Sequence, residues 1–207
     1  MNFLEQMLLN IGFSWQLSML LPFIIILVLG ASIGFMFLKS IKATFWRSSL
    51  SICIGIVFSG VYFAFYPIYI SDLENEFRIE KNSSSNVQND GFMEVLVLPD
   101  CPHCIYSIDL VKKLTLRNAS AKIIYKIVSN DGYGGGIEAK LKDENMRYLH
   151  VPHNADIQTL SKGSYPSFVF HERGAKVVQV WNNNAFGSKA LDFIESKLNR
   201  DWIFDKN

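Results

Sequence analysis

The chain opens with two long apolar stretches, and shorter apolar runs separated by polar residues follow them. Residues 17–38 and residues 50–70 contain no charged side chain. Because a helix rises about 1.5 Å per residue, each stretch spans roughly 30 Å, which is the thickness of the hydrocarbon core of a bilayer. Glycine and serine residues inside both stretches allow two membrane helices to pack closely. The pattern therefore predicts a transmembrane hairpin in the lipid bilayer over residues 17–70, with a connecting loop at 39–49.

A short N-terminal tail, residues 1–16, precedes the hairpin, and a polar segment, residues 71–91, follows it. The polar segment ends in the sequence KNSSSNVQNDG and has no apolar period, which predicts a flexible linker. From residue 92 to residue 207, apolar runs alternate with polar turns, as they do in a soluble domain. The predicted organisation is therefore a tail, a hairpin, a linker and one soluble domain.

The soluble part, residues 92–207, has the pattern of an α/β fold. Runs rich in β-branched and aromatic residues predict strands, and apolar residues that recur every three or four positions predict helices. The predicted strands cover residues 92–98, 121–128, 167–171 and 176–181, and the predicted helices cover residues 102–116, 137–149 and 185–198. The predicted order is β-α-β, an irregular helical insert, and then β-β-α.

Charge excludes one class of function and indicates an orientation. The whole chain carries 20 Lys+Arg and 19 Asp+Glu, and this balance argues against nucleic-acid binding, which needs a basic surplus. Lys39, Lys42 and Arg47 lie between the two apolar stretches, whereas the tail carries only Glu5. The positive-inside rule then predicts a cytoplasmic loop, with both termini on the extracytoplasmic (periplasmic) side of the plasma (inner) membrane.

A Cys-Pro-His-Cys sequence, which begins at Cys101 and ends at Cys104, lies between the first predicted strand and the first predicted helix of the soluble part. Pro102 fits the first turn of a helix, which places Cys101 at the helix N-terminus. Free N–H groups and the positive end of the helix dipole stabilise a thiolate there, and a protonated His103 adds to this effect. Asp100 acts in the opposite direction, because it places a negative charge beside Cys101. A stabilised thiolate leaves more readily, so the disulfide of this pair becomes more oxidising.

With this tetrad the chain resembles the thioredoxin superfamily over residues 92–198. The tetrad is the same as that of the periplasmic disulfide oxidoreductases of the DsbA type. A second match is Tyr165-Pro166 ahead of the third predicted strand, followed eight residues later by Gly174. In thioredoxin-like proteins a cis-proline at this place packs against the redox pair. The resemblance implies that Pro166 is cis and that the backbone of Tyr165 binds a substrate peptide.

Three features depart from the family's pattern. Asp100 stands where thioredoxins carry an aromatic residue before the first cysteine. Val95 stands where a buried acid often lies, and Glu94, one position earlier, is expected to point to the other face of its strand. The long helical insertion of the DsbA type is missing, so the build of the chain is closer to the membrane-anchored thioredoxin-like proteins of the TlpA/ResA type.

The hypothesis that follows is a membrane-anchored thiol:disulfide oxidoreductase that acts on cysteines of extracytoplasmic proteins. Cys101 is the expected nucleophile, and Cys104 is the expected resolving thiol. The reaction needs neither a metal nor an organic cofactor, but a membrane redox partner must reset the pair. The sequence leaves the direction of electron flow, oxidising or reducing, open.

Two other functions stay open. A membrane-tethered metallochaperone would hold copper through Cys101, Cys104 and a distant histidine. An assembly factor would use the membrane hairpin to bind a partner protein, with its thiols secondary. Structural zinc, to which His150, His153 and His171 could contribute, is disfavoured, because it needs four ligands and the chain has no second Cys-x-x-Cys.

Overall fold

The computed structural model describes residues 3–40, 43–81, 91–118 and 121–204. The chain forms two compact units, Met1–Leu73 and Glu74–Asn207, and each unit is described by itself.

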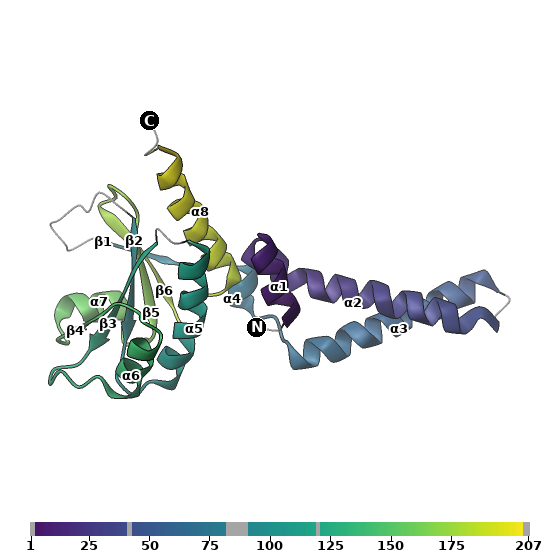
Figure 1. Cartoon of the computed structure of the whole chain (residues 1–207), viewed down its shortest axis with the longest axis horizontal. Helices are drawn as coiled ribbons and strands as arrows, with labels where there is room; N and C mark the ends of the chain where they lie inside the picture. Colours follow the sequence, from purple (N-terminus) through teal and green to yellow (C-terminus); the bar gives the residue numbers. More distant parts are fainter. Residues whose placement is uncertain (1–2, 41–42, 82–90, 119–120, 205–207) are drawn as a thin grey trace. The chain divides into compact units, whose positions relative to one another are not determined.

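The first unit is helical (Figure 1). Its elements are α1 (Phe3–Ile11), α2 (Trp15–Phe37), the short 3-10 helix η1 (Leu38–Ser40), α3 (Thr44–Phe65) and α4 (Ile70–Leu73). Helices α2 and α3 have mean hydropathies of 2.6 and 1.8, and both are long and apolar enough to cross a membrane.

The elements of this unit differ from the prediction in the tail and around α3. The predicted tail, residues 1–16, contains helix α1, whose Leu8 and Leu9 are buried. Helix α3 begins at Thr44, inside the predicted loop of residues 39–49, and it ends at Phe65 rather than at residue 70. Pro67 accounts for the early end, because the residue before a proline avoids the helical conformation.

Glycine brings α2 and α3 into close contact. A side chain at Gly55 would place its Cβ 2.6 Å from the backbone oxygen of Leu27, and a side chain at Gly30 would place its Cβ 3.0 Å from the Cα of Gly55. Arg47 adds a polar contact, because its guanidinium donates hydrogen bonds of 3.0 and 2.6 Å to the backbone oxygen of Phe35. The two helices therefore pack as the small residues in the sequence predict.

The second unit contains a six-stranded sheet in the order β1-β6-β5-β2-β3-β4. Its strands are β1 (Arg78–Lys81), β2 (Phe92–Val97), β3 (Lys122–Val128), β4 (Tyr148–Val151), β5 (Ser167–His171) and β6 (Val177–Asn182). Strands β2, β3 and β4 are parallel, whereas β5 is antiparallel to both β2 and β6. The helices described in this unit are α5 (Pro102–Arg117), α6 (Gly135–Asp143), α7 (Ala155–Ser161) and α8 (Ser188–Phe204).

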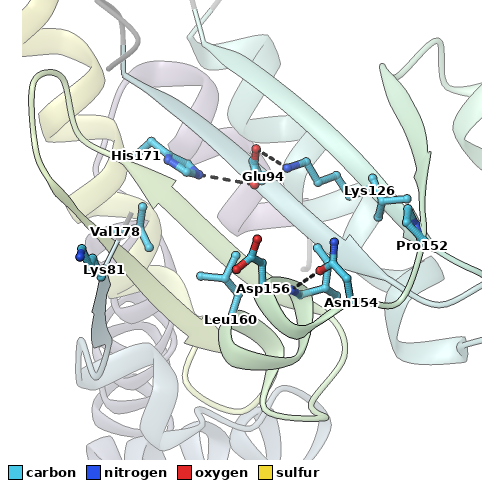
Figure 2. Close-up of a pocket in the computed structure, with 11 residues that line it drawn as sticks. Lys81, Glu94, Lys126, Pro152, Asn154, Asp156, Leu160, His171 and Val178 are labelled. Atoms are coloured by element: carbon cyan, nitrogen blue, oxygen red, sulfur yellow. Dashed lines mark hydrogen bonds and ion pairs between the residues drawn. The ribbon is translucent and has the colours of Figure 1, made fainter. Parts of the chain in front are cut away.

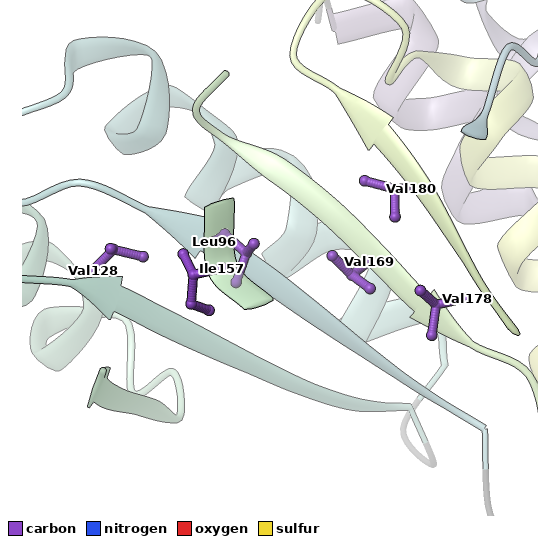
Figure 3. Close-up of a cluster of buried hydrophobic side chains, with 6 residues drawn as sticks. All are labelled: Leu96, Val128, Ile157, Val169, Val178 and Val180. Carbon is purple, nitrogen blue, oxygen red and sulfur yellow. The ribbon is translucent and has the colours of Figure 1, made fainter. Parts of the chain in front are cut away.

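The core of this unit lies on both faces of the sheet. Every residue of β2 is buried, and Figure 1 shows α5 and α8 on the side of the sheet opposite to α7. On the α7 side, the buried cluster in Figure 3 consists of Leu96, Val128, Ile157, Val169, Val178 and Val180. The order β2-α5-β3, followed by β5-β6-α8, is the thioredoxin-like α/β arrangement that the sequence predicts, so the predicted fold class is confirmed.

The predicted flexible linker, residues 71–91, is wrong over part of its length. Strand β1 lies within it and pairs antiparallel with β6 at the edge of the sheet. Just before this strand, Asn75 accepts a hydrogen bond of 2.9 Å from the indole N–H of Trp181, and the ring of Phe77 lies 5.4 Å from that of Trp181. Pairing with β6 and packing against a buried tryptophan order a segment that has little apolar character of its own. Residues 82–90 of the predicted linker lie outside the described residues.

The predicted helix at residues 137–149 is correct only in its first part. Helix α6 ends at Asp143, and β4 follows it and pairs parallel with β3. Four residues that gain a strand partner adopt the extended conformation, whatever their local helical pattern. Helix α7 follows β4 within the predicted irregular insert, where the sequence pattern indicates no bounds for a second helix.

Gly55→Leu is expected to separate α2 from α3, because the added side chain overlaps the backbone of α2. The measurement is oxidative cross-linking between cysteines placed at Phe23 and Tyr62, whose rings lie 4.9 Å apart. The cross-linking yield should fall several-fold. Gly60→Leu is the control, since an added Cβ there meets no atom within 4 Å. An equal yield in the two variants would show that Gly55 does not hold the helices together.

Candidate active site at the start of helix α5

The turn between β2 and α5 places the first cysteine at the helix N-terminus. Cys101 is the N-cap of α5 and has an extended backbone conformation, and Pro102 occupies the first turn. The Sγ of Cys101 accepts a hydrogen bond of 3.2 Å from the backbone N–H of Cys104. The local geometry that the sequence predicts for these two cysteines and the proline is therefore present.

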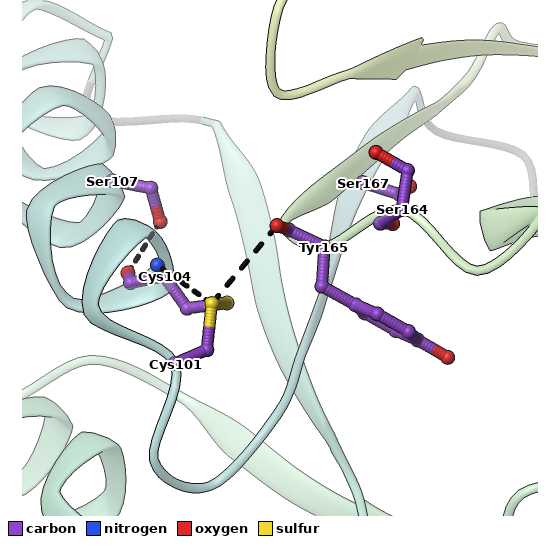
Figure 4. Close-up of a disulfide and its surroundings, with 6 residues drawn as sticks. All are labelled: Cys101, Cys104, Ser107, Ser164, Tyr165 and Ser167. Atoms are coloured by element: carbon purple, nitrogen blue, oxygen red, sulfur yellow. Dashed lines mark hydrogen bonds between the residues drawn. A yellow bond between two sulfur atoms is a disulfide. The ribbon is translucent and has the colours of Figure 1, made fainter.

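The two cysteines form a disulfide whose sulfur atoms have different surroundings (Figure 4). Their Cα atoms lie 5.2 Å apart. Cys104 is 0% exposed, whereas Cys101 is half-buried and His103, next to it in the first turn, is exposed. Cys101 is therefore partly in contact with solvent, whereas Cys104 is enclosed by the protein.

The segment before β5 lies against the disulfide. The Tyr165–Pro166 peptide bond is cis, as the resemblance implies. The backbone oxygen of Tyr165 lies 3.9 Å from the Sγ of Cys101, while its ring points away from the disulfide (Figure 4). The tyrosine hydroxyl accepts a hydrogen bond of 3.2 Å from Ser161 at the end of α7. Tyr165 thus presents only its backbone to Cys101.

Asp100 has a structural contact that the sequence does not reveal. Its Oδ1 accepts a hydrogen bond of 3.3 Å from the backbone N–H of Gly136, in the first turn of α6. The backbone oxygen of Pro99 accepts a second one, of 3.2 Å, from Ile137. Gly135 has a φ of 55°, and a Cβ there would lie 2.8 Å from the oxygen of Pro99. The carboxylate of Asp100 therefore faces the N-terminus of α6 as well as standing beside Cys101 in the sequence.

A buried hydroxyl group contacts the backbone of Cys104, and the sequence pattern does not indicate it. Ser107, one turn further along α5, donates a hydrogen bond of 2.7 Å to the backbone oxygen of Cys104. Tyr125 of β3 is completely buried, and this burial raises the pKa of its phenol, an effect that the Ser107 hydroxyl opposes. The position of Ser107 could have indicated this contact, since a residue three positions after Cys104 lies on the same face of the helix.

Glu94 lies on the other face of the sheet, as predicted from strand alternation (Figure 2). It lines a cavity of about 270 Å³ on the α7 side, and neither cysteine lines that cavity. One carboxylate oxygen lies 2.6 Å from Nζ of Lys126, and the other lies 3.5 Å from Nε2 of His171. Burial raises the pKa of Glu94, but its contacts with His171 and Lys126 outweigh burial and hold the pKa below its ordinary value. This acid therefore stabilises the fold and is not part of the redox site.

The histidines considered as metal ligands lie in separate places. His171 neighbours Glu94, and Nε2 of His150 lies 3.4 Å from a carboxylate oxygen of Glu138. His153 follows β4 and hydrogen-bonds through its backbone to Asn130. Among the described residues, no group of three or more His, Cys, Asp or Glu side chains could hold a metal ion.

No protein-family model and no curated protein matches the chain. Among solved structures, it is similar to a secreted Mycobacterium tuberculosis disulfide oxidoreductase homologous to E. coli DsbE, with 17% identity and a TM-score of 0.39 over 55% of this chain and 84% of that one. A thioredoxin-family thiol:disulfide interchange protein from Chlorobium tepidum is 12% identical, with a TM-score of 0.42 over 54% and 82% of the two chains. StoA from Bacillus subtilis is 11% identical, with a TM-score of 0.36 over 58% and 98%. The strand order of this chain's own sheet, rather than these distant similarities, identifies its fold.

Glu94→Gln is expected to lower the free energy of unfolding by about 2 kcal/mol at pH 7, because it leaves the Lys126 ammonium without its partner. The folded-state pKa of Glu94 is depressed from 4.5, so its stabilising contribution is present above that value and is lost as the pH falls through the lower folded value. Urea unfolding at pH 7 and in stepwise acid measures this difference. A difference between wild type and variant that does not shrink in acid would contradict the assignment, as would a change in the labelling rate of Cys101.

Proposed function

We propose that the chain is a membrane-anchored thiol:disulfide oxidoreductase that acts on cysteines of extracytoplasmic proteins. The observation that carries the proposal is the asymmetric Cys101–Cys104 disulfide. Cys101, at a helix N-terminus beside the Tyr165 backbone oxygen, is partly exposed, and Cys104 is buried. Disulfide exchange requires one sulfur that reacts with the substrate and a second one that resolves the mixed disulfide, and the arrangement gives these roles to Cys101 and Cys104.

In the oxidising direction, a substrate thiolate attacks the Sγ of Cys101. The bond between the two enzyme sulfurs breaks, and its electron pair goes to Cys104, which takes up a proton. A second substrate thiolate then attacks the substrate sulfur of the mixed disulfide and releases Cys101 as a thiolate, which takes up the second proton. The substrate loses two electrons and two protons, and the enzyme pair gains them. In the reducing direction the same steps run backwards, beginning with attack by the Cys101 thiolate on a substrate disulfide.

The surroundings of Cys101 support its role as the exchanging sulfur. The backbone N–H of Cys104 lies 3.2 Å from its Sγ and stabilises a thiolate there, together with the helix N-terminus. His103, when protonated, adds a positive charge in the same turn. Asp100 opposes these groups through its charge, but its carboxylate also bonds the first turn of α6. A peptide substrate would pass the exposed side of Cys101 and hydrogen-bond to the backbone beside Pro166.

The proposed location is the extracytoplasmic side of the plasma membrane. Helices α2 and α3 supply the two spans, and the positive charges of Lys39, Lys42 and Arg47, which lie between the spans or in the first turn of α3, favour a cytoplasmic connection. Because each turnover leaves the pair in the opposite redox state, a membrane redox partner must reset it. Disulfides persist in extracytoplasmic compartments, so the location and the chemistry are consistent.

Cys104→Ala is expected to accumulate mixed disulfides with client proteins, because the thiol that resolves them is gone. Cys101→Ala should trap almost none, because its remaining cysteine is buried. The measurement is non-reducing electrophoresis of the full chain from membranes, after thiols are blocked with acid and alkylating agent. Cys53→Ala is the matched control, since Cys53 lies in α3 and outside the pair. More trapping by Cys101→Ala than by Cys104→Ala would contradict the assigned roles.

A reporter fused after Asn207 is expected to behave as extracytoplasmic, and one inserted at Lys42 as cytoplasmic. The reason is the cluster of positive charge at the end where α2 connects to α3. Paired alkaline phosphatase and fluorescent-protein fusions measure both positions. The reverse pattern would place the redox pair in the cytosol, where thiols are generally kept reduced, and would contradict the proposed compartment.

A further inference from the structure

Strand β1 makes a hydrogen bond and an ion pair with the segment that precedes Tyr165. The guanidinium of Arg78 donates a hydrogen bond of 2.8 Å to the backbone oxygen of Leu160, in the last turn of α7. The carbonyls of a last helical turn have no partner within the helix, so this contact satisfies one of them. The next charged residue of the strand, Glu80, lies 3.1 Å from Nζ of Lys162, just after α7.

The segment from Leu160 to Tyr165 is a compact turn, so a contact that fixes Leu160 also restrains Tyr165. Lys162 has a φ of 49° and ends α7, with its N–H bonded to the backbone oxygen of Gln158 at 2.8 Å. The hydroxyl of Ser161, which is 1% exposed, lies 3.3 Å from the N–H of Gly163 and donates to the hydroxyl of Tyr165. One end of this turn is held by Arg78, and the other end places the Tyr165 oxygen 3.9 Å from the Sγ of Cys101.

We infer that Arg78 is a positioning residue for the redox pair, acting through Ser161 and Tyr165. The inference rests on the proposed function and deepens it. In the reduced pair, the thiol of Cys101 can donate a hydrogen bond to the Tyr165 oxygen, whereas the thiolate is repelled by the partial negative charge of that oxygen. A firmly held Tyr165 oxygen therefore favours the thiol over the thiolate. Loosening the turn weakens this preference and lowers the pKa of Cys101.

The sign of the effect distinguishes positioning from charge. Removing a positive charge without moving Tyr165 would make the thiolate less stable and raise the pKa of Cys101. Removing the hydrogen bond that holds the turn does the reverse, because it lowers the pKa of Cys101. Ser161→Ala removes the hydrogen bond to the Tyr165 hydroxyl and changes no charge. If Arg78 acts by positioning Tyr165, Ser161→Ala and a variant that removes the Arg78 guanidinium should both lower the pKa of Cys101.

The test uses the full chain in detergent, in a Cys53→Ala background, reduced and then alkylated across a range of pH. Arg78→Met and Ser161→Ala should each raise the labelling rate of Cys101 at pH values below its pKa by about three-fold, the size expected for one weak hydrogen bond. Arg78→Lys keeps a donor and should stay near wild type. The double variant Arg78→Met/Ser161→Ala should be labelled no faster than the faster single variant, because the two residues act in series. Lys176→Met, in the β5–β6 turn, is the control for loss of a surface cation.

Unchanged or slower labelling of Arg78→Met would overturn the inference, and so would fully multiplicative effects in the double variant. If Arg78→Met does not fold, Ser161→Ala decides alone, and labelling equal to wild type overturns the inference. These outcomes are separate from the proposed function. A wild-type chain that exchanges no disulfide with glutathione contradicts the function, whereas an active chain with unaffected variants contradicts only the role of Arg78.

Discussion

The position of β2 between β3 and β5 is the constraint on which the candidate site depends. Strands β2 and β3 are parallel, so their C-terminal ends lie at the same end of the sheet, and β5, which is antiparallel to β2, begins at that end. The Cys-Pro-His-Cys turn after β2 is therefore flanked by the Tyr165–Pro166 turn on one side and by the glycine-rich turn before α6 on the other. Strand pairing, rather than any local sequence preference, brings these three turns together.

The start of α5 then makes the two sulfur atoms different. Cys101 caps the helix and accepts a backbone N–H, while Cys104, one turn inside, faces the core. A proline directly after the cap favours this start, because its missing N–H costs nothing there. In an exchange reaction, bond formation then occurs at the solvent side and the departing charge appears inside the protein. On that inner side the hydroxyl of Ser107 donates a hydrogen bond to the backbone oxygen of Cys104, so the start of α5 has a polar contact inside the core.

Local chemistry predicts part of this site, and strand pairing determines the rest. The cap at Cys101 and the helix after it follow from the Pro102 position, and Glu94 follows from strand alternation. The contact between Asp100 and Gly136 spans 36 residues and exists only because β3 pairs with β2. Strand β1 and helix α7 are equally difficult to predict, since four and seven residues are too short for a clear hydrophobic period. The prediction of a flexible linker fails for this reason.

The inclusion of β1 in the sheet changes which part of the chain acts as the tether. Residues 82–90 connect two strands of one sheet, so the stretch that joins α3 to the sheet is residues 66–77, which include helix α4 and end with Phe77 packed on Trp181. The strand that follows this stretch contacts the turn that carries Tyr165, because Arg78 bonds Leu160 and Ser161 bonds Tyr165. The segment that leaves the apolar helices is therefore connected directly to the turn beside the redox pair.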